Sequence, residues 1–425
     1  MEVLFGGLFV DLETIAVQKH QLQTTCLRPS GDAVWSLASL LAPVSLECFG
    51  DVYWGRELLH ITREVSGFYD GLIALTDLER YFSLGELFQR HSVQAVSQRW
   101  GRDEGSPTSL GDINERLHYG DSLRLRRMEC LLDPSAPIVA LAREIELTLQ
   151  HPLNSLSCYI TPVGASGLGP HHDETEIFTL QIEGTKRWQL FHRVQATEPA
   201  MYDRTELGEP SLELELCPGD LLYLPSGWVH DVSSDEASFS ITMVFDPFRW
   251  TAVLDALGER LRSISPMLET MPMGVALGDN AQAGFHRQLK SCLKIIRDDL
   301  DNFEGTMLVD MLASRLLSRM NMPPTHAVSD MLRLDQMTPV TLVQRRRDVA
   351  CHLARRTDTI ALMLPGGQVI DAPSSAEPAF RAIIESDKPF RVTDVHASLD
   401  EAASMSLVRV LIGAGLLEVV NDNGG

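Results

Sequence analysis

Two short segments of the chain carry side chains that could together bind a metal ion. The first, residues 169–173, reads Gly-Pro-His-His-Asp, and the second, residues 225–230, reads Pro-Ser-Gly-Trp-Val-His. Two histidines and one carboxylate form the ligand set of non-haem Fe(II) oxygenases, which leaves other positions of an octahedral iron open. Because a β-strand sends residues i and i+2 to the same face, His171 and Asp173 could hold one ion together. His230 would then arrive from a distant strand.

Residue type alone leaves the ligand register open. His172 and Glu174 are also two residues apart, and iron would accept either carboxylate. A single His-x-Asp also occurs in polar turns that bind no metal. Two features favour a metal site: residues 163–170 form a glycine-rich approach to a strand, and His230 follows two turns at the start of another strand. The separation from Asp173 to His230 (230 − 173 = 57 residues) suffices for a hairpin and a returning strand.

Composition describes a globular protein with room for several domains. The 425 residues are 44% hydrophobic and suffice for two or three cores. No apolar run reaches the roughly 18 residues of a membrane span, and the amino terminus lacks the basic segment of a signal peptide. The seven cysteines are scattered without a Cys-x-x-Cys pair, which favours a reducing, cytoplasmic setting. The net charge of −22 disfavours nonspecific nucleic-acid binding and favours a basic partner.

The segments that must position the metal-binding side chains read as short strands. Between residues 159 and 245 the apolar pattern has a period of two, and turn residues separate the runs. Short strands joined by turns predict a jelly-roll β-sandwich or barrel. Ahead of them, Pro137 opens an amphipathic helix that reaches residue 149. The predicted strands are 177–182, 186–191, 212–216, 221–224 and 238–245.

Beyond the last of these strands the pattern becomes helical. Residues 251–320 carry apolar residues at helical spacing, and Met-Pro-Pro at 322–324 marks a boundary. The final segment combines a strand at 360–364, a Pro-Gly-Gly turn, and helices near 379–384 and 401–413. Helices together with a β-ribbon are consistent with a winged-helix module.

Several stretches of the sequence resemble the JmjC-type ribosomal oxygenases, a family of cupin-like Fe(II)/2-oxoglutarate hydroxylases. These stretches are 157–162 (Ser-Cys-Tyr-Ile-Thr-Pro), 169–188, 215–230 and 49–63. The resemblance covers most of the chain, is weak before residue 45, and has central motifs that are specific in combination. It implies an α+β fold whose core is a double-stranded β-helix of the jelly-roll, cupin or JmjC type, with helical elaborations.

The resemblance selects one ligand register. It places Fe(II) on His171, Asp173 and His230, which would be the catalytic centre, and leaves His172 as a spectator. The reaction that it implies is decarboxylation of 2-oxoglutarate to succinate by O2, coupled to hydroxylation of a target C–H bond. In such a reaction the cofactor supplies the difficult chemistry, and the protein holds the target in place.

The same resemblance implies residues that bind the co-substrate. Lys186 would hold the far carboxylate of 2-oxoglutarate, because a buried carboxylate needs a cation. The Tyr159 hydroxyl would help to hold that carboxylate, and Ser240 matches a small polar residue of the last core strand. Arg187 should be exposed. Three nearby aromatic residues, Trp188, Phe178 and Phe191, are expected in the core.

The family's organisation implies three domains. Residues 1–250 would form the JmjC/cupin-like catalytic domain with an N-terminal elaboration and a core at about 150–250, residues 251–330 a helical dimerisation domain, and residues 331–425 a winged-helix-like domain. A homodimer is therefore expected. Acidic residues outnumber basic ones beyond residue 358, so we expect no DNA binding. The arginines at 345–347 and 355–356 are expected on solvated helix faces or beside an acidic neighbour.

Three classes of function fit these features. The first is hydroxylation of a protein or peptide side chain, with a ribosomal-protein His or Arg suggested by the family. The second applies the same chemistry to a natural-product peptide precursor or to methyl-lysine, and the third is an inactive JmjC binding module. Ser157 stands where close eukaryotic relatives carry an asparagine, which weakens any transfer of substrate identity. Loops around 90–125 and 192–212 would read the substrate.

Overall fold

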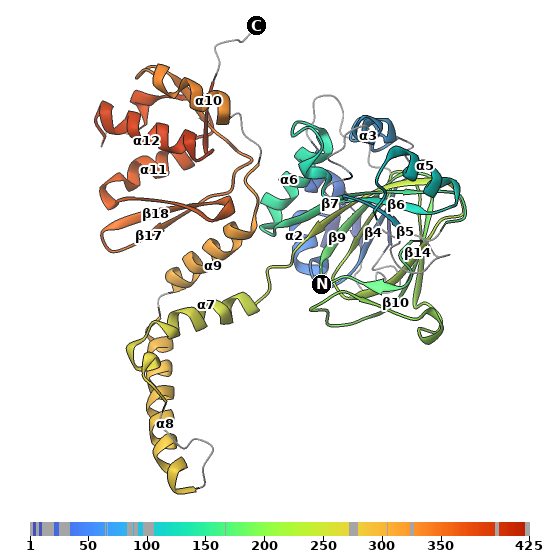
Figure 1. The fold of residues 1–425 in the computed structure, drawn as a ribbon. Coiled ribbons are helices and arrows are strands. Elements are labelled where there is room, and N and C mark those ends of the chain that lie inside the picture. The colour runs from blue at the N-terminus through green and yellow to red at the C-terminus, as the bar shows by residue number, and fades with distance from the viewer. Residues whose placement is uncertain are drawn as a thin grey trace. The chain divides into compact units, whose positions relative to one another are not determined.

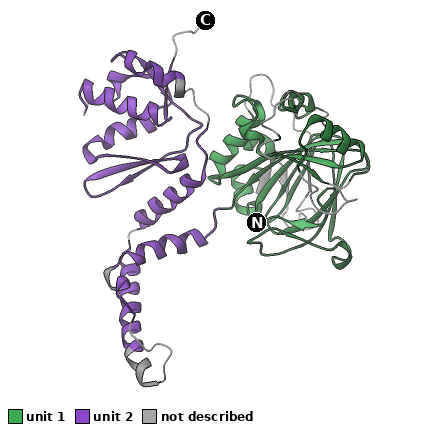
Figure 2. Cartoon of the chain, viewed as in Figure 1, with its two compact units in different colours: residues 1–247 green, residues 248–425 purple. Residues whose placement is uncertain are grey.

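The chain divides into two compact units, residues 1–247 and 248–425 (Figure 2). The structure is a computed structural model, and no helix of its described part is long and apolar enough to cross a membrane. The predicted further division near residue 330 stays a prediction. The structure describes residues 3–5, 8–10, 21–24 and 35–420, apart from 64, 66, 83–87, 89–91, 97–105, 166, 272–278, 304, 324–326 and 396–398.

Two facing sheets of the described strands form the body of the first unit and build the predicted jelly roll (Figure 1). The larger sheet has the spatial order β3 (Gln21–Thr24), β4 (Leu59–Arg63), β13 (Leu221–Leu224), β9 (Glu176–Glu183), β15 (Ser238–Phe245), β7 (Leu153–Thr161), β6 (Ser122–Leu125) and β5 (Val93–Val96). The smaller sheet has the order β11 (Ala200–Met201), β8 (His171–His172), β14 (Trp228–Ser233), β10 (Lys186–Arg193) and β12 (Leu212–Leu216). A separate pair joins β1 (Val3–Phe5) to β2 (Leu8–Val10).

The alternation of side chains along the larger sheet separates a dry core from the interior of the jelly roll. On β13, Leu221 and Tyr223 join the main hydrophobic core, and Leu222 and Leu224 join a second cluster between the sheets. On β15 the odd-numbered residues from Phe239 enter the main core, so the even-numbered residues face the other way. β15 is therefore buried on both faces, and every second residue along it faces the interior of the jelly roll.

Helices cover the outer face of the larger sheet. The predicted amphipathic helix is confirmed as α6, which begins at Pro137 and buries Ile138, Leu141 and Ile145 in the main core beside β7. Helix α6 spans Pro137–Leu149. The other α-helices described in this unit, with one π-helical turn, are α1 (Leu37–Leu41), α2 (Leu46–Cys48), the π-helical turn (Phe49–Tyr53), α3 (Leu75–Phe82) and α5 (Leu110–His118).

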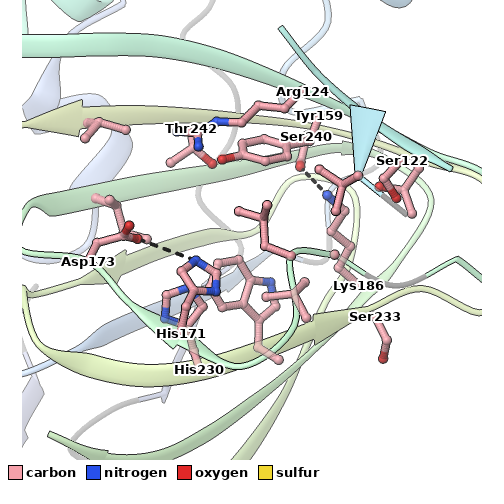
Figure 3. Close-up of a pocket in the computed structure, with 18 of the residues that line it drawn as sticks. Ser122, Arg124, Tyr159, His171, Asp173, Lys186, His230, Ser233, Ser240 and Thr242 are labelled. Carbon is pink, nitrogen blue, oxygen red and sulfur yellow. Dashed lines mark hydrogen bonds and ion pairs between the residues drawn. The ribbon is translucent and has the colours of Figure 1, made fainter. Parts of the chain in front are cut away.

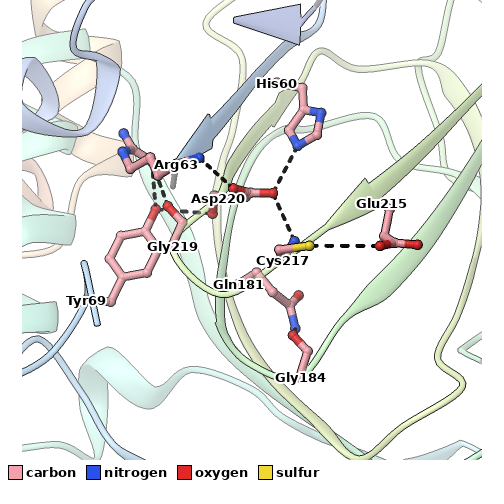
Figure 4. Close-up of polar contacts among 9 residues, drawn as sticks. All are labelled: His60, Arg63, Tyr69, Gln181, Gly184, Glu215, Cys217, Gly219 and Asp220. Atoms are coloured by element: carbon pink, nitrogen blue, oxygen red, sulfur yellow. Dashed lines mark hydrogen bonds and ion pairs between the residues drawn. The ribbon is translucent and has the colours of Figure 1, made fainter. Parts of the chain in front are cut away.

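One buried carboxylate ties β4 to the turn before β13 (Figure 4). Asp220 is 2% exposed and accepts hydrogen bonds from the backbone amides of Arg63 and Cys217, both at 2.9 Å. Its other contact is His60 Nε2 at 3.4 Å, and the Arg63 guanidinium donates to the carbonyl of Gly219 at 2.8 Å. Because a buried carboxylate is tolerated only when its oxygens have partners, this network fixes the turn against β4.

The second unit is helical at first and then mixed. Its strands form two three-stranded sheets within the described residues, and α11 and α12 share a hydrophobic core with them. The winged-helix assignment stays a prediction. The helices are α7 (Thr251–Arg262), α8 (Asp279–Asp301), α9 (Gly305–Arg319), α10 (Ala327–Arg333), α11 (Glu377–Ile384) and α12 (Glu401–Gly413). The strands are β16 (Leu342–Arg345), β20 (Phe390–Arg391) and β21 (Leu417–Val419), then β17 (His352–Arg355), β18 (Thr359–Leu364) and β19 (Gln368–Pro373).

The arginines at 345–347 and 355–356 lie outside the helices, so the expectation of helix faces was wrong. Arg345 ends β16 and Arg355 ends β17, because alternating apolar residues on these segments pack against the unit's core. Arg355 forms an ion pair with Glu377 at 2.5 Å, and neighbouring Arg356 pairs with Asp371 at 2.9 Å. The expected acidic neighbour is therefore confirmed for Arg355 and Arg356.

Candidate metal centre and its cavity

The structure brings the three predicted ligands together between the sheets (Figure 3). One ligand atom from each of His171, Asp173 and His230 lies within 4.8 Å of the other two. His171 on β8 and His230 on β14 are direct cross-strand partners, with ring centroids 4.2 Å apart. His171 Nε2 lies 3.9 Å from Asp173 Oδ2. Two imidazoles and one carboxylate on one side of a cavity are the facial donor set of a non-haem iron.

A backbone carbonyl orients each of the two histidines. His171 Nδ1 lies 2.8 Å from the carbonyl oxygen of Gly169, and His230 Nδ1 lies 2.9 Å from that of Trp228. A carbonyl oxygen only accepts, so each Nδ1 is the donor, and in a neutral ring Nε2 then carries the lone pair that faces the cavity. Such partners fix the tautomer of a metal-binding histidine. The donor set therefore fits a divalent metal.

Burial keeps His230 in the form that a metal requires. His230 is 3% exposed, and this burial together with neighbouring His171 lowers the pKa of His230 to about 4. The imidazole is therefore neutral at pH 7, and only a neutral imidazole can bind a metal. The Trp188 ring stacks on His230 with centroids 5.3 Å apart and an interplanar angle of 24°.

His172 points to the other face of β8. Its Nδ1 lies 2.8 Å from the Tyr202 hydroxyl, and its Nε2 lies 2.9 Å from the carbonyl oxygen of Glu198. Both ring nitrogens are thus engaged by the segment that pairs with β8 through β11. Glu174, the other half of the alternative register, is not among the described residues that line the cavity.

Lys186 lies in the cavity as a buried cation. It is 6% exposed, its Nζ donates to Ser240 Oγ at 2.8 Å, and burial lowers the pKa of Lys186 to about 7. No described carboxylate forms an ion pair with it, and burial is the sole cause of the lowered pKa. A buried ammonium without an anion is costly, and an incoming carboxylate would relieve that cost. The cavity therefore fits a dicarboxylate bound to the metal at one end and to Lys186 at the other.

Tyr159 lies between two cations of the cavity. The Lys186 ammonium lies 5.2 Å from its ring centroid, and the Arg124 guanidinium carbon lies 5.5 Å from the same centroid. Burial raises the pKa of the Tyr159 phenol, so it is a hydrogen-bond donor at neutral pH. Among the described contacts, Tyr159 meets Lys186 through its ring, and the expected contact of its hydroxyl with the far carboxylate of 2-oxoglutarate stays a prediction. Its hydroxyl points toward the side of Thr242 in Figure 3.

Sequence reasoning missed several residues of the cavity, and three of them bear on its chemistry. Arg124 and Thr242 line it, and so does Trp188, which had been placed in the core. Trp188 also belongs to the hydrophobic cluster between the sheets, so its large ring is both a core residue, as expected, and part of the cavity wall. The period of two could have indicated Thr242, which is two residues from Ser240 on β15. Arg124 falls within a segment expected to read the substrate, but on strand β6 and not on a loop.

Comparison with known proteins finds relatives that carry a JmjC domain. Residues 140–253 match the JmjC domain family. Curated relatives include the bifunctional lysine-specific demethylase and histidyl-hydroxylase NO66 of Drosophila pseudoobscura pseudoobscura, which is 26% identical over 70% of this chain and 33% of its own length. Ribosomal oxygenase 2 of Mus musculus is 26% identical over 64% of this chain and 62% of its own length. The chain therefore spans between a quarter and two thirds of these first relatives.

Solved structures share the fold. The ribosomal oxygenase YcfD of Escherichia coli in complex with cobalt and succinic acid has a TM-score of 0.57 and 18% identity, covering 89% of this chain and 99% of YcfD. YcfD in complex with cobalt and 2-oxoglutarate has a TM-score of 0.54 and 16% identity over the same share of this chain. The predicted resemblance to the JmjC-type ribosomal oxygenases and the predicted jelly-roll core are thus confirmed.

Replacing the ligands tests the register directly. We expect His171→Ala or Asp173→Ala to lower succinate production by more than about a hundredfold, because each removes one metal ligand. His172→Ala should retain it, since His172 faces away from the cavity. Succinate formation by the purified variants with added Fe(II) measures this. Loss of activity in His172→Ala together with survival in His171→Ala would overturn the assignment.

The lowered pKa of Lys186 predicts a pH-dependent affinity for 2-oxoglutarate. Lys186 carries its charge below its pKa of about 7 and loses it above. Affinity should be flat below that pH and then weaken by up to about tenfold per pH unit, because binding must take up a proton. Anaerobic calorimetry with Mn(II) between pH 6 and 9 measures it.

Two variants serve as references for this titration. Lys186→Met should bind weakly at every pH, and Arg187→Met, on the exposed face of the same strand, should keep the normal profile. A pH-independent affinity in the unaltered protein would contradict the assigned role of Lys186.

Proposed function

We propose that this chain, a relative of the JmjC-type ribosomal oxygenases, is an Fe(II)- and 2-oxoglutarate-dependent dioxygenase that hydroxylates a protein or peptide side chain. The observation that carries the proposal is one cavity that contains His171, Asp173 and His230 together with the unneutralised cation Lys186. The YcfD structures with cobalt and either 2-oxoglutarate or succinic acid support the same pair of ligands here.

Different residues of the chain would bind the metal and the co-substrate. His171, Asp173 and His230 would hold the metal, which when bound couples O2 reduction to decarboxylation of 2-oxoglutarate. Lys186 and Ser240, already hydrogen-bonded to each other, would hold the far carboxylate of the co-substrate. Apolar side chains such as Ile177, Trp188 and Val232 line part of the cavity and would limit the access of water to the bound metal.

The substrate class is proposed from the relatives and from charge. NO66 is named as a histidyl-hydroxylase and lysine-specific demethylase, and other relatives are named ribosomal oxygenases. An acidic protein with a net charge of −22 suits basic ribosomal proteins. A His or Arg side chain of such a protein is therefore the proposed target. The complete set of ligands and Lys186 argues against an inactive binding module.

Mass spectrometry tests this function. Proteins of the host with and without the gene should differ by a gain of about 16 Da on one side chain, because hydroxylation inserts one oxygen atom. The purified protein should release succinate only with Fe(II) and 2-oxoglutarate, and Asp173→Ala should serve as the inactive control. A loss of about 14 Da on a methyl-lysine would instead indicate demethylation, and the absence of succinate release would refute the proposal.

We also propose that residues 251–330 mediate a homodimer, that residues 331–425 are a winged-helix-like module without DNA affinity, and that the protein is cytoplasmic. Exposed leucines 289, 293 and 300 recur along one side of α8 at helical spacing, which suits a second copy. The six described cysteines are all free, as a reducing compartment favours.

Sedimentation velocity tests the dimer. The unaltered protein should sediment as two copies. Leu293→Glu should shift it toward one copy, because a buried charge would oppose association. Lys290→Glu, an exposed position on the same helix, should leave it unchanged. A monomer at every concentration of the unaltered protein would contradict the proposal.

A further inference from the structure

We infer that Arg124 selects the target side chain and that the cavity accepts a neutral or acidic group with a hydrogen-bond acceptor, and not a guanidinium or ammonium group. This inference rests on the proposed function and deepens it. It gives a role, binding of the target side chain, to the part of the cavity that neither the metal ligands nor Lys186 occupies.

Arg124 is built into the wall of the cavity. It lies on β6 directly opposite Tyr159 of β7, and Tyr159 is in turn opposite Ser240 of β15. A cross-strand row presents its side chains on one face, so all three point into the jelly-roll interior. Each of the three lines the same cavity as the metal ligands.

The cavity has two polar ends. Figure 3 shows Lys186 and Ser240 meeting at one side, and Arg124 extending toward the side of Thr242 and Asp173. The first end suits the far carboxylate of the co-substrate. The second lies beside the metal ligands, where a target side chain must enter to react.

The guanidinium of Arg124 has no partner of its own among the described residues. Its Nε is buried and makes no hydrogen bond, and its described side-chain contact is with the face of the Tyr159 ring. An arginine offers five N–H donors and no acceptor, and a buried donor without a partner is costly. Arg124 is therefore positioned to receive an acceptor from outside the chain.

The groups around Arg124 are also suited to donate. The Tyr159 phenol stays protonated because burial raises its pKa. Thr242 lines the same cavity, and its hydroxyl shares a 3.1 Å hydrogen bond with Thr179. Hydroxyl hydrogens turn toward whichever acceptor is nearby. This end of the cavity thus combines one cation with two hydroxyl groups.

The charges of the loaded cavity lead to the same conclusion. Besides the histidine ligands, the charged side chains among the described lining residues are Arg124, Lys186 and Asp173. The metal dication and the co-substrate dianion would offset each other, and Asp173 would offset Lys186. The positive charge of Arg124 is then not compensated. Arg124 would repel a second cation that enters beside it, and that cation would lose its hydration without gaining an ion pair with a carboxylate.

This distinguishes between the proposed targets. An imidazole nitrogen, a carboxamide oxygen or a carboxylate can accept from Arg124, whereas an arginine or methyl-lysine side chain offers only positive charge. A site that hydrogen-bonds its substrate also rejects analogues that lack the matching group strongly. The inference therefore favours a histidine, asparagine or aspartate side chain.

Degenerate peptide libraries test the inference. Each library would fix the central residue as His, Asn, Asp, Arg or Lys and would be incubated with the Fe(II)-loaded protein, 2-oxoglutarate and O2. The His, Asn or Asp libraries should gain oxygen at the centre at least about tenfold faster than the Arg and Lys libraries. Arg124→Glu should reduce or reverse that ratio, and Arg124→Lys should largely keep it. Arg187→Glu, on the exposed face of β10, is the matched control.

A binding measurement separates this inference from the proposed function. The same libraries would be passed over immobilised protein loaded with Mn(II) and 2-oxoglutarate without O2, and retention would be measured. Retention of acceptor libraries that depends on Arg124 supports the inference even if no succinate is ever formed. Equal treatment of Arg and His libraries, or the same pattern in Arg124→Glu, overturns it. So does a raised KM for 2-oxoglutarate in Arg124→Glu without peptide, since Arg124 would then serve the co-substrate.

Discussion

The geometry of the metal centre depends on one antiparallel pairing, in which His171 of β8 lies directly opposite His230 of β14. Strand β8 is only two residues long, so little else along the strand fixes its register. A slip of one residue would turn His172 and Glu174 toward the cavity and His171 and Asp173 away from it. The two ligand registers that residue type leaves open are thus the two registers of this pairing.

Contacts on both faces of β8 stabilise the observed register. On the inner face, His171 is oriented by the carbonyl of Gly169. On the outer face, both nitrogens of His172 are engaged by Tyr202 and by the carbonyl of Glu198. His172 therefore does not bind the metal, but it stabilises the structure, because its hydrogen bonds would be lost if the strand slipped by one residue.

The same period of two determines what else the cavity contains. Lys186 and Trp188 alternate with exposed Arg187 on β10, and Ser240 and Thr242 alternate with core residues on β15. Among the described residues that line the cavity, two cations, Lys186 and Arg124, face one carboxylate, that of Asp173. An excess of positive charge in a largely enclosed cavity is unfavourable, so the cavity favours anionic and hydrogen-bond-accepting ligands.

The sequence was sufficient for features with a strong local signal. The strand alternation predicted the jelly roll, Pro137 predicted the start of α6, and α12 was predicted from residue 401 to residue 413 as observed. The cluster of His171, Asp173 and His230 followed from spacing and resemblance. The place of Arg124 beside Tyr159 depends on the pairing of β6 with β7, which no local pattern encodes. The arginines near 345 and 355 were misplaced because short strands packed on a helical core lack a clear period.

A crystal structure of the protein soaked anaerobically with Mn(II) and 2-oxoglutarate tests the central claim most directly. We expect one metal ion bound by Nε2 of His171, a carboxylate oxygen of Asp173 and Nε2 of His230, with the far carboxylate of 2-oxoglutarate on Lys186. A metal ion bound by His172 and Glu174, or a co-substrate carboxylate placed away from Lys186, would contradict it.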